Sequence, residues 1–228
     1  MKIFDFQQYT AEWWEARRGV PTASEFHRII SPKKWEYAAG AKGYIHDLIA
    51  EVYDPMYGRH DQYASRAMAV GTHLEPEARR FYEFSQSCEV QQVGFCLTDD
   101  GRFGCSPDAL VGEEGGLELK GPAYKTQVKW LLDGGVPPEH LAQCHGFLVV
   151  TGRPWIDFLS YCPPLPSLLL RVERDDRTEA LETALRKFCG EFCGARDVIK
   201  KLYTPPPTQT KSYGETVVEL SVHEESPF

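Results

Sequence analysis

Two carboxylates and a lysine near the middle of the chain have the types and spacing of a hydrolytic metal site. Asp108 and Glu118 flank a glycine-rich turn, and Lys120 follows Glu118 by two residues. If the turn centres on Glu114, antiparallel pairing places Asp108 opposite Lys120. Because side chains of a strand alternate between its two faces, the three groups then share one face. The hairpin therefore predicts a compact acidic cluster with one ammonium group beside it.

This cluster suits the hydrolysis of a phosphodiester. Close carboxylates repel each other unless they are protonated or bridged by a cation, and hard oxygen ligands suit Mg²⁺ or Mn²⁺. A neighbouring lysine can orient or help deprotonate an attacking water. Spacing alone leaves open a solvated hairpin with ordinary cross-strand Asp–Lys pairing. Pro107 favours the site, because it fixes the backbone immediately before Asp108.

A second group of residues, near the N-terminus, can bind a phosphate. Arg17 offers a planar fork for an anion, and Ser24 lies in the first turn of a predicted helix, where free N–H groups attract anions. Thr22 to Glu25 has the pattern of a capping box. The simpler interpretation is that Thr22 caps the helix and Arg17 forms a surface ion pair. The residues alone leave both interpretations open.

Apolar periodicity predicts the elements that must position these groups. We expect helices over 10–18, 22–30, 36–53, 64–86, 123–133, 138–151 and 176–203, and strands over 89–97, 102–111, 117–120, 154–162 and 167–174. This order predicts an α/β (α+β) fold with a mixed central sheet flanked by helices. We expect one domain over 1–203, followed by a Pro-rich linker and a flexible acidic tail over 204–228.

Charge and cysteine content limit the class of protein. The net charge is −8, which argues against a protein that coats nucleic acid, but residues 75–120 alone carry −6 and residues 204–228 carry −3. Seven cysteines without a Cys-x-x-Cys pair predict free thiols in a reducing compartment. No apolar run is long enough to span a bilayer, and the start lacks a signal-peptide pattern. We therefore expect a cytoplasmic protein without a membrane partner.

Four motifs of the chain resemble, in order, those of the phage lambda exonuclease family of viral recombinases, within the PD-(D/E)xK nuclease superfamily. The resemblance extends from about residue 12 to 175. The motifs are Trp13-x3-Arg17-Arg18-Gly19-Val20-x-Thr22-Ala23-Ser24-Glu25, Gly71-x3-Glu75-x2-Ala78, Gly104-Cys105-Ser106-Pro107-Asp108 with Gly116-Leu117-Glu118-Leu119-Lys120, and Leu141-Ala142-Gln143. The resemblance implies a restriction-endonuclease-like core.

The resemblance also implies roles for the residues of the nuclease core. Asp108, Glu118 and the carbonyl oxygen of Leu119 would bind one Mg²⁺, and Glu75 would help to hold a second, with Mn²⁺ able to substitute. Lys120 would position the attacking water.

Three further implications concern the substrate and the second ion. Gln143 would sit against Lys120 and the scissile phosphate. Arg17 and Ser24, together with Thr22, would hold the 5′-phosphate of the digested strand. The family has another acidic residue shortly before its Ser-Pro-Asp motif. Ungapped alignment puts Thr98 there, so Asp99, one residue later, is a candidate ligand of the second ion.

The function implied is a Mg²⁺-dependent 5′-to-3′ exonuclease that digests the 5′-phosphorylated strand of duplex DNA to mononucleotides. The 3′ overhang left behind would serve phage-type single-strand annealing in a bacterial host. A ring-shaped homotrimer and a single-strand-annealing recombinase are the implied partners. The last five residues, 224–228, resemble the acidic tip of bacterial single-strand-binding proteins, which would add host repair proteins. Alternatives are a restriction-like or structure-specific endonuclease and a catalytically silent DNA-end-binding scaffold.

Overall fold

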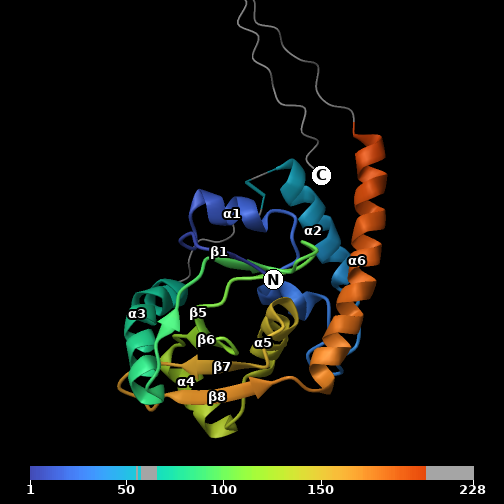
Figure 1. Ribbon diagram of the computed structural model, residues 1–228. Coiled ribbons are helices and arrows are strands. Elements are labelled where there is room, and N and C mark those ends of the chain that lie inside the picture. The colour runs from blue at the N-terminus through green and yellow to red at the C-terminus, as the bar shows by residue number, and fades with distance from the viewer. Residues whose placement is uncertain (55, 58–65, 204–228) are drawn as a thin grey trace, which may run out of the picture.

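The computed structural model of the chain describes residues 1–54, 56, 57 and 66–203 (Figure 1). The predicted linker and tail lie outside the described residues. The helices are α1 (Ala11–Arg17), the 3₁₀ helix η1 (Ala23–Arg28), α2 (Ala41–Tyr53), α3 (Arg66–Gln86), α4 (Tyr124–Asp133), α5 (Pro138–Thr151) and α6 (Asp176–Leu202). The strands are β1 (Lys2–Phe4), β2 (Val90–Gln91), β3 (Phe95–Leu97), β4 (Gly104–Cys105), β5 (Ala109–Val111), β6 (Gly115–Lys120), β7 (Trp155–Ser160) and β8 (Leu168–Glu173).

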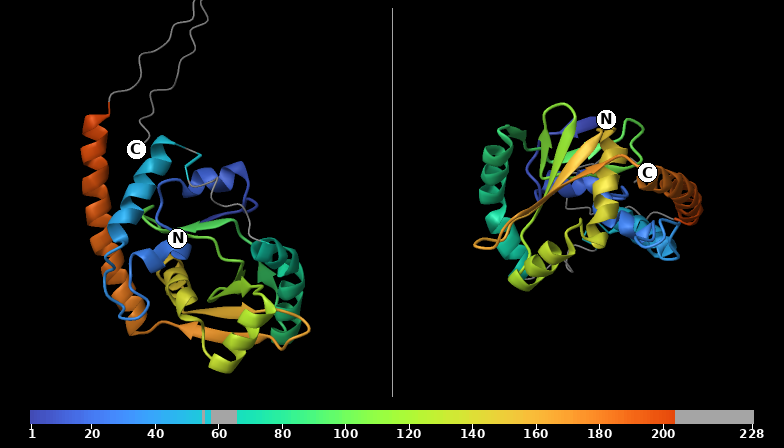
Figure 2. Two further views of the ribbon diagram at one scale, coloured as in Figure 1. Left: turned by 180° about the vertical axis from the view of Figure 1, so that it is seen from behind. Right: turned by 90° about the horizontal axis from the view of Figure 1, so that it is seen from below.

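A five-stranded mixed sheet forms the centre of the fold, in the order β2-β5-β6-β7-β8. Only the β6–β7 pair is parallel among these neighbours, because α4 and α5 provide the long crossover that parallel strands need. Strands β1, β3 and β4 form a smaller antiparallel sheet. Figure 2 shows α3 on one side of the large sheet and α5 on the other. This arrangement confirms the predicted mixed α/β fold with flanking helices.

Two of the predicted strands are each divided between the two sheets. The expected strand 89–97 becomes β2 and β3, and the expected strand 102–111 becomes β4 and β5. Gly94 lies at the first break, where a Cβ atom would come within 2.1 Å of the Phe6 carbonyl oxygen. Pro107 lies at the second break and has no N–H to give to a ladder. The segment before Asp108 is therefore the junction between the two sheets.

The hairpin of β5 and β6 has a different register from the one predicted. Val111 pairs with Gly115 and Ala109 with Leu117, so the turn centres on Glu113 rather than Glu114. Gly112 adopts a φ of 50°, in the left-handed region, and begins the turn one residue early. Continuing this register places Asp108 opposite Glu118 instead of Lys120. Moving the turn centre by one residue shifts the partner of each strand residue by two positions. Because side chains alternate with a period of two, the acids and the lysine still share a face.

Helix α5 makes close contacts on two sides, and both contacts depend on a glycine. A Cβ atom at Gly116 of β6 would lie 2.2 Å from the ring of Phe147. A Cβ atom at Gly146 would lie 2.6 Å from the ring of Phe26 in η1. Helix α5 is therefore held tightly between the strand that carries Glu118 and the short helix that follows Thr22.

The cysteines agree with the sequence prediction. All seven are free thiols, and five of them are buried. Among the helices that the structure describes, none is both long enough and apolar enough to cross a bilayer.

Candidate active site

Asp108 and Glu118 form an acid pair where β5 begins to separate from β6. Glu118 is 4% exposed, and Asp108 is partly buried. The Asp108 N–H donates to the Leu117 carbonyl at 3.1 Å, and the Leu119 N–H donates to Asp108 Oδ2 at 2.5 Å. Burial and the charge of Glu118 raise the pKa of Asp108 to about 8. The two carboxylates are thus close enough to disfavour ionisation of both.

Lys120 and Gln143 both contact Glu118 and partly offset this charge. The Lys120 ammonium forms an ion pair with Glu118 Oε1. Gln143 Nε2, from α5, donates to the same oxygen at 2.6 Å. Burial disfavours the ammonium, but the charges of Glu118 and Asp108 outweigh this effect and raise the pKa of Lys120 above its ordinary value. In this arrangement Lys120 is a protonated hydrogen-bond donor.

The carbonyl of Leu119 faces the side of the strand on which Asp108 lies. The N–H and C=O groups of a strand residue point to the same side, and successive residues alternate. The Leu119 N–H donates to Asp108, whereas the Lys120 carbonyl accepts from the Tyr161 N–H of the β7 side at 2.8 Å. Asp108, Glu118 and the Leu119 carbonyl therefore converge as oxygen donors.

This donor set fits Mg²⁺. The ligands are hard oxygens, and a buried acid pair favours a cation. Over residues 1–54, 56, 57 and 66–203, no cluster of three or more acidic, histidine or cysteine side chains could hold an ion. The carbonyl oxygen would therefore have to join the two carboxylates, and water would complete the shell, as Mg²⁺ commonly requires.

Glu75 lies at the edge of the acid pair, whereas Asp99 does not. Burial raises the pKa of Glu75 on α3, and the charges of Arg79, Lys120 and then Glu118 also act on it. Asp99 lies in the turn between β3 and β4, is 84% exposed, and pairs with the amino terminus of Met1 at 3.0 Å. The structure does not bring Asp99 together with the predicted ligands, because its turn is organised by its own hydrogen bonds.

Arg17 lies in a cluster with three hydroxyl groups. Its Nη1 donates to Ser106 Oγ at 3.0 Å and its Nη2 to Thr22 Oγ1 at 3.2 Å. Thr22 Oγ1 lies 3.3 Å from Ser24 Oγ. The guanidinium group also lies 4.3 Å from the ring centre of Trp13. We call Arg17, Thr22, Ser24 and Ser106 the arginine pocket.

The arginine pocket differs from the simpler interpretation of its sequence. Thr22 stands at the N-cap position of η1, but its side chain makes no capping hydrogen bond and accepts from Arg17 instead. Within the described part of the chain, no carboxylate forms an ion pair with Arg17, and burial lowers its pKa. A desolvated guanidinium group bonded only to neutral hydroxyls favours an anion.

Through Ser106 the arginine pocket is connected along the chain to Asp108 of the acid pair, a link that the sequence analysis did not identify. Its Oγ accepts from Trp13 Nε1 at 2.9 Å as well as from Arg17. Ser106 precedes Asp108 by two residues. The Ser-Pro-Asp motif contains this residue, but its spacing does not indicate the partners of Ser106 in α1.

The two histidines of α5 have packing roles. His145 Nδ1 lies 2.9 Å from Thr178 Oγ1 and joins α5 to the start of α6. His140 packs 5.5 Å from the ring centres of Trp130 and Phe158. Burial lowers the pKa of His140 to about 3, so the ring is neutral at ordinary pH.

Comparison with known proteins identifies relatives over most of the chain. An alkaline exonuclease from Laribacter hongkongensis is 34% identical, with a TM-score of 0.73 over 85% of this chain and 97% of that one. The same exonuclease in complex with dAMP gives 33% identity and a TM-score of 0.74, with the same coverage. A phage-related exonuclease from Haemophilus somnus 129PT, at 11% identity and a TM-score of 0.55 over 81% of this chain and 96% of that one, shares the fold. A search of curated protein sequences finds no match.

The YqaJ-like viral recombinase domain matches residues 12–154. This span includes both the arginine pocket and the acid pair, together with Lys120 and Gln143. The family match and the structural match at about one-third identity agree with the resemblance that the motifs predicted. The chain belongs to the YqaJ-like viral recombinase family, a family of lambda-exonuclease-like proteins.

Proposed function

We propose that this protein is a Mg²⁺-dependent 5′-to-3′ exonuclease that acts on duplex DNA ends in phage-type recombination. It digests the 5′-phosphorylated strand to mononucleotides and leaves a 3′ single-stranded overhang. The observation that carries the proposal is the link through Ser106 between a desolvated arginine and a buried acid pair. The relationship to an alkaline exonuclease, solved also with the mononucleotide dAMP, supports it.

The residues around the acid pair have separate roles in the proposed hydrolysis. Bound Mg²⁺ would supply an activated water and stabilise the leaving oxygen, and Mn²⁺ can replace it. Asp108, Glu118 and the Leu119 carbonyl are the groups that would hold one ion, and Glu75 would help to hold a second. Lys120, being protonated, donates a hydrogen bond that orients the water, rather than removing its proton.

Gln143 and the arginine pocket position the strand. Gln143 orients Glu118 through its amide and can donate to the scissile phosphate. A terminal phosphate bound at Arg17 is held near Asp108, because Ser106 contacts Arg17 and lies two residues before that acid. The first phosphodiester bond is then presented to the acid pair, so cleavage releases one nucleotide at a time from the 5′ end.

Linear duplexes with 5′-phosphate or 5′-hydroxyl ends test this proposal, each with Mg²⁺ and with EDTA. We expect mononucleotide release that requires Mg²⁺ and prefers the 5′-phosphate. Cleavage of closed circular DNA, or indifference to the 5′-phosphate, would instead favour a restriction-like or structure-specific endonuclease. End binding without any release would favour the silent scaffold.

The proposal extends to assembly and partners. A homotrimeric ring would hold DNA by enclosure, which suits a chain whose net charge is −8 and whose body outside residues 75–120 and the tail is nearly neutral. Light scattering should give about three times 25.9 kDa, and a monomeric mass would contradict enclosure. A single-strand-annealing recombinase, and host repair proteins bound by residues 224–228, complete the proposed partners in a bacterial cytoplasm. Co-purification with and without those five residues tests the second group.

A further inference from the structure

Tyr9 is an exposed aromatic residue with a left-handed backbone conformation. Its side chain is 62% exposed, although it is large and aromatic. Its φ of 67° lies in the left-handed region, which is unfavourable for a bulky residue. Such a conformation persists only where neighbouring contacts impose it, and it is concentrated at functional sites.

Contacts on both sides of Tyr9 impose this conformation. Gln8 Nε2 donates to the carbonyl oxygens of Val93 and Pro107, at 3.3 and 3.0 Å. These bonds attach the segment to the connection between β2 and β3 and to the residue immediately before Asp108. Thr10 Oγ1 donates to the Gln7 carbonyl at 2.9 Å and accepts from the Trp13 N–H at 3.4 Å. The backbone is therefore fixed before and after Tyr9, and the ring is directed outward.

The ring of Tyr9 lies between the two halves of the site. It packs on one side against Trp13, with ring centres 5.0 Å apart, and Trp13 itself contacts Arg17 and Ser106. Desolvation, followed by the charges of Glu75 and Asp108, raises the pKa of Tyr9.

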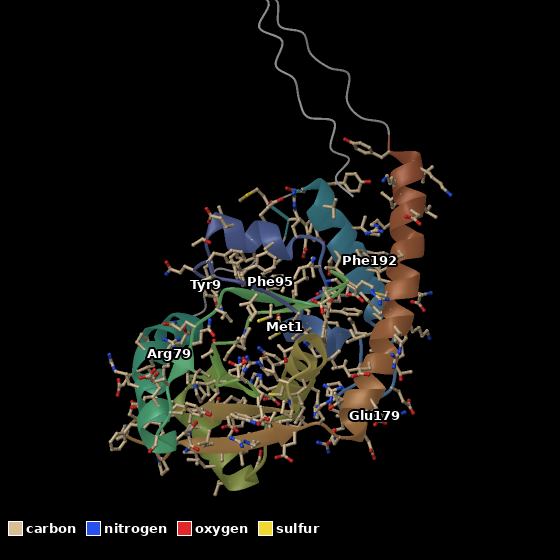
Figure 3. All side chains as sticks on the ribbon, viewed as in Figure 1. Met1, Tyr9, Arg79, Phe95, Glu179 and Phe192 are labelled. Atoms are coloured by element: carbon tan, nitrogen blue, oxygen red, sulfur yellow. The ribbon has the colours of Figure 1, made fainter. Side chains whose placement is uncertain are left out.

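The charges of Lys120 and Arg17 act on the same phenol in the opposite direction. Groups from the acid pair and from the arginine pocket therefore both lie near one ring. Figure 3 shows Tyr9 between α1 and α3.

We propose that Tyr9 stacks on the terminal base of the digested strand, between the 5′-phosphate held at Arg17 and the first phosphodiester bond. The inference rests on the proposed function and adds a base-binding residue to it. Trp13 contacts the ring on one side, at an interplanar angle of 43°, and the exposed remainder is available to a base. Aromatic stacking tolerates every base because each has a π-face, which suits an enzyme that digests any sequence.

The test uses duplex DNA with a 5′-phosphate and with 2-aminopurine as the terminal base. Binding is measured in EDTA, so that the DNA is not cleaved. Wild-type protein and Tyr9→Phe should quench the fluorescence. Tyr9→Asn, whose side chain tolerates a positive φ, should leave the fluorescence high and weaken end binding about tenfold. Phe84→Ala, which removes an aromatic side chain that is 88% exposed on α3, is the matched control and should behave as wild type.

A terminal abasic nucleotide completes a thermodynamic cycle. Removing the base should weaken binding by wild-type protein about tenfold and binding by Tyr9→Asn hardly at all. Equal losses in both proteins, or full quenching by Tyr9→Asn, would overturn the inference. If Tyr9→Asn lowers the melting temperature, Tyr9→Gly, which adopts the same φ without strain, takes its place in the test.

The two proposals fail separately. Normal quenching and coupling with no nucleotide release under any metal would reject the exonuclease and retain the stacking role. Normal release with no effect of Tyr9 on quenching would do the reverse.

Discussion

The acid pair and the arginine pocket are opposite in charge and differ in how their charges are balanced. At the acid pair, Glu118 accepts from Lys120 and Gln143, while Asp108 accepts from a backbone N–H. At the arginine pocket, Arg17 is bonded to neutral hydroxyls and packed on an indole ring. The first region retains excess negative charge, and the second retains an unneutralised positive charge.

The difference supports the proposal that each region is completed by a different part of the substrate complex. Desolvated charges are costly unless they are paired, so the acid pair favours a cation and the arginine pocket favours an anion. A metal ion and a terminal phosphate would supply the two. The regions also lie on different supports: the acid pair on the five-stranded sheet, and the pocket on α1, η1 and the junction at Ser106 and Pro107.

Replacing Glu118 should produce the largest effect of these variants. It should affect hydrolysis but not the binding of DNA ends. Glu118→Gln keeps the shape and removes a metal-binding charge, so the rate of nucleotide release should fall at least about a thousandfold, since the metal contributes several kcal/mol to transition-state stabilisation. Binding of 5′-phosphorylated ends, measured by anisotropy, should be largely spared. Glu114→Gln, on the exposed turn of the same hairpin, is the control. A variant that keeps a tenth of the wild-type rate would refute the metal-ligand role.

Replacing Arg17 should have the opposite signature. Arg17→Ala should reduce the preference for 5′-phosphate over 5′-hydroxyl ends on the order of a hundredfold, because charge-assisted hydrogen bonds are lost. The ratio of kcat/KM values for the two ends measures this. Arg18→Ala, which removes a neighbouring arginine paired with Glu15, should leave the ratio unchanged. An unchanged ratio in Arg17→Ala would assign Arg17 a purely structural role.

The sequence predicted those features that depend on residues close together in the chain. Glu118 and Lys120 share a face because they are two residues apart in one strand, whatever the turn does. The helices and the order of elements follow from local periodicity. The division of two predicted strands between two sheets could not be predicted, because it depends on Gly94 approaching Phe6 from a distant part of the sequence.

The parts of the site that the sequence missed are contacts between distant segments. Gln8 and Ser106 contribute through partners about 90 residues away, which spacing cannot reveal. Asp99 is the reverse case, a residue that the sequence included among the candidate ligands. An alignment ambiguous by one residue put it there, and the hydrogen bonds of its own turn hold it away from the acid pair. The register differed because a left-handed Gly112 moved the turn, which composition does not specify.

Ser106→Ala tests whether the two regions are coupled. The variant removes the shared acceptor of Trp13 and Arg17, while Trp13 keeps the Gly94 carbonyl at 3.1 Å. We expect the 5′-phosphate preference to fall about tenfold and the free energy of unfolding to fall by about 1–3 kcal/mol. Ser85→Ala, an exposed serine on α3, controls for the loss of a hydroxyl.

The double variant of Ser106 and Arg17 tests whether Ser106 acts through Arg17. If Ser106 acts by orienting Arg17, adding Ser106→Ala to Arg17→Ala should hardly change the preference further. Fully additive losses would show that Ser106 acts independently of Arg17.

The smallest effect is expected at Thr22, whose hydroxyl contacts both Arg17 and Ser24. Thr22→Val keeps the volume of a side chain that is 4% exposed, and valine suits the extended backbone at φ −119°. Losing one hydrogen bond to Arg17 should lower the 5′-phosphate preference about threefold through weaker end binding, with kcat unchanged. Thr22→Ser should restore it. An equal loss on 5′-hydroxyl ends would instead mean that Thr22 stabilises η1 and its contacts with Gly104 and Tyr44, and that the anion is selected by Arg17 and Ser106 without it.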